Sequence, residues 1–139
     1  MLYPFYICTQ VITEHLLPRH KEIGGMGLWI TSIAWKDGDT LQLYAGDSEG
    51  SVMILRSSDI ENPKFFQEKK NEFVHRLSIC GILAVSQENF VFTIAFDHLV
   101  KGLDATNGNE LFRYKNPNKC NFSCLAWDTS THELIAGDE

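Results

Sequence analysis

Three polar residues near the end of the chain have the residue types of a hydrolytic triad: Asp128, Ser130 and His132. In such a triad the imidazole takes the hydroxyl proton and the carboxylate orients the imidazole. Triad members come from distant parts of a chain and meet in space, whereas these three stand two positions apart in a turn-rich segment, 128–133. We therefore interpret them as turn residues.

Cys120 and Cys124, with His132 nearby, raise the question of a zinc site. Two residues four positions apart on a strand face the same side but lie about 13 Å apart, which is too far to ligate one ion. The aspartates of segment 37–47 lack the spacing of an EF-hand loop. No glycine-rich phosphate-binding pattern occurs either. We expect no metal and no cofactor.

The composition indicates one globular unit and excludes several classes of partner. The chain has 139 residues, of which 44% are hydrophobic and 12% aromatic. Its net charge of −6 and scattered basic residues argue against a nucleic-acid-binding face. No stretch reaches the roughly 20 apolar residues of a membrane helix. The start lacks the charged region and cleavage site of a secretory signal, so we expect a cytoplasmic protein with reduced thiols and no membrane partner.

Internal repeats organise the chain. The segment "ITSIAW" (30–35) recurs as "FSCLAW" (122–127), and "LYAGDSEG" (43–50) recurs as "LIAGDE" (134–139). The tryptophans that end the first pair lie 92 positions apart, so a repeat of half that length predicts a third copy between them. "ICGILAV" (79–85) occupies this place. The three copies are aligned through Ile33–Ala34–Trp35, Leu83–Ala84–Val85 and Leu125–Ala126–Trp127.

Each copy continues with further short apolar runs that are separated by Gly, Asp, Asn and Ser. Runs of this length and composition predict β-strands. The expected strands after the first in each copy are 41–46, 50–57 and 62–67 in the first copy, 90–96, 98–105 and 107–114 in the second, and 134–137 in the third. Many are apolar on consecutive positions, which indicates cover on both faces. An all-β fold of four-stranded antiparallel sheets, each covered by copies of itself, is a β-propeller.

These repeats resemble the WD-repeat β-propeller family. "GMGLWITSIAW" (25–35) is similar to the opening of a family repeat, and "AGDSEGSVMILR" (45–56) is similar to its turn and third strand. "DHLVKGLD" (97–104) keeps the turn aspartate, Asp97, and the final aspartate, Asp104. Family members often join this turn aspartate to a loop histidine, a strand hydroxyl and a late tryptophan. Here the loop positions counted from the Leu-Ala motif hold no histidine and His75 stands one residue away, with Thr93 as the nearest hydroxyl. Those loop positions are Met26, Arg76 and Asn118.

The resemblance implies a non-enzymatic scaffold that binds proteins through its loops, with no small-molecule substrate. Its position in the repeat makes Trp29 a candidate for partner binding, and Arg76 and Lys119 follow by the same logic. Structural roles are expected for Trp35, Trp127, Asp97 and Asp104. The alternative is an enzyme or sensor propeller with a site in its central channel, which would need a ring of His or Asp residues from several loops.

The expected organisation is a non-repeat segment, 1–24, followed by blades at 25–70 and 71–116 and the first half of a third blade at 117–139. A propeller closes with four or more blades, so we expect the chain to be part of a larger propeller protein. Its divergent repeats, poor in tryptophan, resemble those of large cytoskeletal and ciliary WD-repeat proteins. This resemblance implies a cytoskeletal or ciliary location within the cytoplasm.

Overall fold

The structure is a computed structural model that describes residues 29–36, 38, 40–57, 59, 66–71 and 73–139. Every regular element in these ranges is a β-strand, and all paired strands are antiparallel. The all-β, antiparallel class expected from the sequence is therefore confirmed. The described residues contain no helix with the length and apolar character needed to cross a membrane. The expected N-terminal segment, 1–24, lies outside the described residues.

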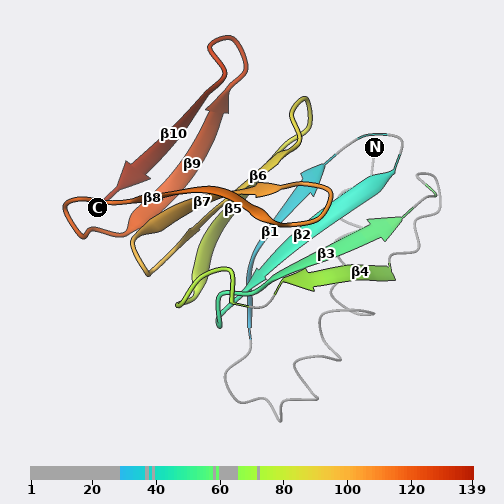
Figure 1. Ribbon diagram of the computed structural model, residues 1–139, viewed down its shortest axis with the longest axis horizontal. Coiled ribbons are helices and arrows are strands. Elements are labelled where there is room, and N and C mark those ends of the chain that lie inside the picture. The colour runs from blue at the N-terminus through green and yellow to red at the C-terminus, as the bar shows by residue number, and fades with distance from the viewer. Residues whose placement is uncertain (1–28, 37, 39, 58, 60–65, 72) are drawn as a thin grey trace.

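The strands form three sheets that follow one another in chain order (Figure 1). The first sheet holds β1 (Ile30–Lys36), β2 (Leu41–Asp47), β3 (Val52–Ser57) and β4 (Phe66–Asn71). The second holds β5 (Ile79–Val85), β6 (Phe90–Ala95), β7 (Leu99–Asp104) and β8 (Glu110–Lys115). The third pairs β9 (Phe122–Asp128) with β10 (Glu133–Asp138). Within each sheet, strands adjacent in sequence are adjacent in space, because short turns join antiparallel neighbours.

The fourth strand of the first sheet differs from the sequence prediction. It runs from Phe66 to Asn71, whereas the expected strand spanned 62–67. The segment 62–65 lies outside the described residues. The residues "QEKKN" (67–71) after the aromatic pair gave no apolar signal, and only the pairing of β4 with β3 identifies them as strand.

A bulge at the same place in all three sheets changes the alignment of the repeats. One residue has no partner just after the first residue of β1, β5 and β9: Thr31, Cys80 and Ser123. Counted from these bulges, Trp35 matches Ala84 and Trp127. The sequence alignment of Trp35 with Val85 was therefore wrong by one residue, because the Leu-Ala pair of β5 stands one position later than its counterparts.

Two hydrophobic clusters join successive sheets. The cluster between the first and second sheets brings Tyr44, Val52 and Ile54 against Ile79 and Leu103. The cluster between the second sheet and the β9–β10 hairpin is smaller and contains Ile94, Val100 and Phe122. Each of these side chains is more than 90% buried, and full burial of such a group contributes about 1.5–3 kcal/mol. The first strands of successive sheets are also neighbours, since β5 contacts β1 and β9 contacts β5.

Candidate interaction surface

A buried histidine links the loop before β5 to the turn between β6 and β7. His75 is 1% exposed. Its Nδ1 lies 3.0 Å from both carboxylate oxygens of Asp97, and its Nε2 lies 2.8 Å from Thr93 Oγ1. Because a carboxylate only accepts hydrogen bonds, Nδ1 carries the proton and donates it to Asp97. A neutral ring then accepts the Thr93 hydroxyl proton at Nε2, which satisfies both nitrogens.

This arrangement corrects the loop alignment made from the sequence. Counted back from the bulges, the residue that matches Met26 and Asn118 is His75, not Arg76. His75 therefore stands at this loop position in the second sheet, and it is bonded to Asp97 and Thr93.

Asp97 also accepts backbone hydrogen bonds from two directions. Its Oδ2 accepts from the Arg76 N–H at 3.0 Å and its Oδ1 from the Leu99 N–H at 3.2 Å. The intervening His98 adopts a φ of 65°, a left-handed conformation that the tight turn requires. One carboxylate therefore fixes both the turn and the neighbouring loop.

The carboxylate, imidazole and hydroxyl are in the order of a catalytic triad, but the site is closed. Thr93 is 0% exposed and lies on β6, one of the two central strands of the second sheet. A nucleophile must reach a reacting atom at about 3–3.5 Å, and no substrate can approach a hydroxyl buried within the fold. The network is a structural tie between loop and turn.

Burial sets the pH dependence of this network. Desolvation lowers the pKa of His75 below its ordinary value and outweighs the opposing effects of Asp97 and Glu110, while Lys101 adds to the lowering. The folded chain thus binds fewer protons at His75 than the unfolded chain, whose histidine pKa is about 6.5. The stability that the neutral, buried His75 contributes is therefore fully present above about pH 6.5, and it is lost as the pH falls toward the folded-state pKa.

We expect the free energy of unfolding to fall between pH 7 and pH 5.5, with up to about 1.4 kcal/mol per pH unit coming from His75. Urea titrations at several pH values measure it. The His75→Gln variant isolates this group, because the remaining histidines still titrate in it. Equal pH slopes in the wild type and the variant would show that His75 does not carry this dependence.

The turn between β2 and β3 packs against the same loop. The Ser48 hydroxyl accepts from the Trp29 N–H at 2.9 Å, and the Gly50 carbonyl accepts from the His75 N–H at 2.9 Å. Gly50 has a φ of 87°, and a Cβ placed there would lie 2.2 Å from the carbonyl oxygen of His75. Only glycine allows so close an approach.

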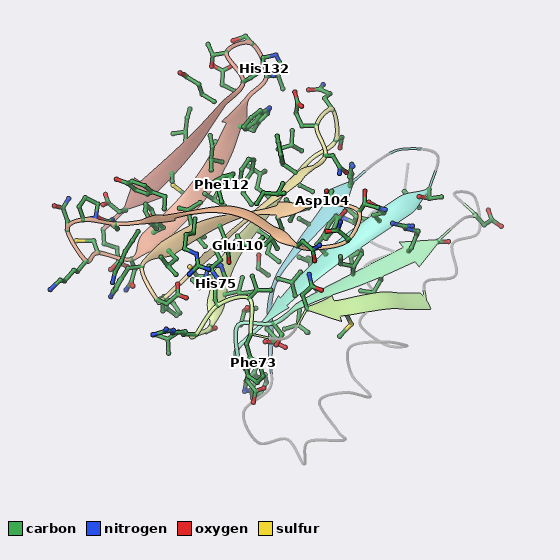
Figure 2. The ribbon with its side chains drawn as sticks, viewed as in Figure 1. Phe73, His75, Asp104, Glu110, Phe112 and His132 are labelled. Atoms are coloured by element: carbon green, nitrogen blue, oxygen red, sulfur yellow. The ribbon has the colours of Figure 1, made fainter. Side chains whose placement is uncertain are left out.

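Four large apolar side chains are exposed on these joined segments. Their exposed fractions are 60% for Trp29, 73% for Phe73, 51% for Leu77 and 47% for Phe96. Backbone hydrogen bonds connect these segments to one another. One of them joins the segment after β6 to the loop before β5, where the Phe96 N–H donates to the Ser78 carbonyl at 3.1 Å. We call these four residues, together with Arg76, the loop face. Figure 2 shows Phe73 projecting away from the sheets on the side of the β4–β5 loop.

The three residues predicted to bind partners lie on successive loops. Trp29 precedes β1, and Arg76 is exposed between two members of the loop face. Lys119 is exposed in the loop before β9 and adopts a φ of 56°. Its backbone N–H donates to the Asn116 carbonyl, and the Asn116 N–H donates to the His98 carbonyl at 2.9 Å. The structure thus joins Trp29 and Arg76 in one face and places Lys119 on the adjoining turn.

Of the four residues predicted to have structural roles, Asp97 lies beside the loop face, and the other three lie at the opposite ends of their strands: Trp35, Trp127 and Asp104. Trp35 packs against the cluster on the other face of the first sheet, formed by Leu41, Leu43, Ala45, Met53 and Leu55. Trp127 stacks on Phe92, with ring centroids 5.5 Å apart. Backbone bonds from Thr106 and Asn107 lower the pKa of Asp104 below its ordinary value and hold the β7–β8 turn.

Asp128, Ser130 and His132 do not form a hydrolytic triad. Asp128 Oδ1 accepts from the Ser130 hydroxyl at 2.6 Å, as in a capped turn. His132 instead lies with its Nδ1 3.0 Å from Glu88 Oε1, at the tip of the β9–β10 hairpin (Figure 2). Cys120 and Cys124 are free thiols. No group of three potential ligands that could hold a metal ion occurs in the described ranges.

Sequence reasoning missed Phe73, Leu77 and Phe96. Their apolar character matched that of the neighbouring strands, and only their positions outside β5 and β6 mark them as loop residues. For Phe73 and Leu77, the signal that could have identified them is their spacing on either side of His75 and Arg76, two polar residues that interrupt the apolar pattern of a strand. Phe96 gave no such signal. Comparison with protein-family models and with curated protein sequences finds no match for this chain.

Proposed function

We propose that this chain is part of a WD-type β-propeller that acts as a non-enzymatic scaffold for protein partners. The three bulged inner strands, neighbours in chain order, support the propeller assignment. The tie between His75 and Asp97 supports the family resemblance. Two blades, at 25–70 and 71–116, and the first half of a third blade, at 117–139, follow from this proposal. The proposed cytoplasmic location, cytoskeletal or ciliary, rests on the likeness of the repeats alone.

The observation that carries the proposed function is the loop face. Large apolar side chains exposed on neighbouring loops mark interaction sites, because isolated soluble surfaces rarely gather them. Aromatic residues and arginine contribute most of the binding energy at protein interfaces, and the loop face contains three exposed aromatic residues and Arg76. The backbone N–H groups of His75 and Arg76 donate to the Gly50 carbonyl and to Asp97. These bonds hold the loop in place before a partner arrives, which reduces the entropy cost of binding.

We expect a Phe73→Ala, Leu77→Ala double variant to lose partner binding by about tenfold or more, since a truncated interface anchor typically costs 2 kcal/mol or more. The measurement is quantitative mass spectrometry of proteins retained from lysate by the immobilised full chain. Leu111→Ala is a matched control, because Leu111 on β8 is also 51% exposed but lies outside the loop face.

A specific partner lost in the double variant and kept by the Leu111→Ala variant supports the proposal. Equal loss in both variants would indicate nonspecific apolar adhesion. Retention that survives in the double variant would place the binding surface elsewhere.

A further inference from the structure

A second candidate site lies on the side of the molecule, between the outer strands of the first two sheets. It is a groove of about 500 Å³. We call it the lateral groove and define it by Phe73, Val74, Lys101, Asn109, Glu110 and Arg113. It shares only Phe73 with the loop face, so different variants test the two sites. In Figure 2 Glu110 lies between the labels of His75 and Asp104, over the second sheet.

The floor of the groove holds a nearly buried ammonium group. Lys101 is 7% exposed, and its Nζ donates to the Val74 carbonyl and to Glu110 Oε2, the latter at 2.7 Å. A buried cation is costly unless it is paired and hydrogen-bonded. These two acceptors meet that requirement and fix the position of the Glu110 carboxylate.

The same carboxylate is shared with a second cation. Glu110 Oε1 accepts from Arg113 Nε, so one negative charge lies between two positive ones. The described lining residues therefore carry a net charge of +1. This charge stands out in a chain whose formal net charge is −6.

Arg113 is the group that can receive a ligand. Its side chain is 63% exposed, and its contact with Glu110 uses Nε alone. In the part of the chain that the structure describes, no residue accepts a hydrogen bond from its terminal amino groups. A guanidinium offers paired donors that match a carboxylate. Phe73, 73% exposed, provides an aromatic wall to the same groove.

We propose that the lateral groove binds an extended peptide segment with one carboxylate beside an apolar side chain. Arg113 pairs with the carboxylate, and Phe73 and Val74 contact the apolar group. A phosphate dianion fits less well, because the groove offers a single net positive charge and Glu110 repels a double negative charge more strongly than a single one. The single net charge and the apolar lining together favour an aspartate or glutamate beside an apolar side chain.

Fluorescence anisotropy with the full chain tests the proposal. The probes are a capped, labelled peptide Ser-Leu-Asp-Leu-Phe, a counterpart with asparagine in place of aspartate, and a counterpart with phosphoserine there. We expect the aspartate peptide to bind about tenfold or more tightly than the asparagine peptide, since a charge-assisted bidentate pair is lost. The phosphoserine peptide is expected to bind no better than the aspartate peptide.

The variants assign that preference to one side chain. Arg113→Gln is expected to abolish the preference for aspartate over asparagine, while leaving Lys101 paired with Glu110. Lys115→Gln removes one positive charge from the same strand outside the groove, and Leu77→Ala alters the loop face. Both are expected to keep the preference. Absence of binding at millimolar peptide, a preference that survives in the Arg113→Gln variant, equal losses in the Arg113→Gln and Lys115→Gln variants, or tighter binding of phosphoserine would overturn the proposal.

Discussion

The Asp97→Ala variant is expected to have a free energy of unfolding about 3–5 kcal/mol lower than that of the wild type, because it leaves three N–H donors without their acceptor and each buried unsatisfied donor costs about 1–3 kcal/mol. Asp97 accepts hydrogen bonds from the His75 ring and from the backbone of Arg76 and Leu99. Each of these donors loses its acceptor in the variant. Urea denaturation followed by tryptophan fluorescence measures the change.

Two further variants serve as a milder change in the same network and as a control outside it. Thr93→Val removes only the hydroxyl that bonds His75, so its expected cost is about 1–2 kcal/mol, and it remains measurable if the Asp97→Ala variant is mostly unfolded. Glu133→Ala removes an exposed carboxylate from β10 and is expected to change stability by less than about 0.5 kcal/mol. A loss below 1 kcal/mol for Asp97→Ala would mean that the network does not hold the loop and turn together.

The strands were predictable from the sequence because their signal is local. Runs of apolar residues bounded by turn residues mark β2, β6 and β7, and each run is buried on both faces. The polar β4 had no such signal, because its strand conformation depends on pairing with β3. Local composition thus predicts the class of fold, whereas strand limits depend on contacts between distant residues.

The misalignment of His75 arises because the Leu-Ala pair occupies a different strand position in β5. All three first strands have an unpaired residue at the same place, which is Cys80 in β5. The Leu-Ala pair of β5 stands one position further from this bulge than the corresponding pairs of β1 and β9. Counting from the pair therefore moved the loop position from His75 to Arg76, and only the pairing between strands reveals the bulge from which the count must start.

The lateral groove could not be predicted at all from the sequence. Lys101 and Glu110 lie on neighbouring strands, and their ion pair depends on the irregular pairing of β7 with β8 near Leu103. Arg113 joins them because it is paired with Lys101 across the strands. In the sequence these three residues are ordinary charges of a solvent-exposed hairpin. The spatial arrangement makes them a site.

Gly50→Ala is the second variant for which we expect a large effect. The residue has a φ of 87°, and the new Cβ would lie 2.2 Å from the His75 carbonyl oxygen and 2.8 Å from that of Leu77. Both neighbours are backbone atoms, so the loop itself must move. With the cost of a left-handed non-glycine residue included, we expect a loss of about 3 kcal/mol or more. Gly38→Ala is the matched control, because its nearest atom would be 3.8 Å from the new Cβ.

The loss in the Gly50→Ala variant should overlap with the loss in Asp97→Ala rather than add to it. Both substitutions displace the segment around His75, one by pushing it from the β2–β3 turn and the other by releasing it from the β6–β7 turn. Residues that act on one element show interaction energies of about 0.5–3 kcal/mol in a double-mutant cycle. Denaturation of the two single variants and the double variant measures this coupling. If the two losses add fully, the turns hold His75 independently and the loop face is fixed at two separate points.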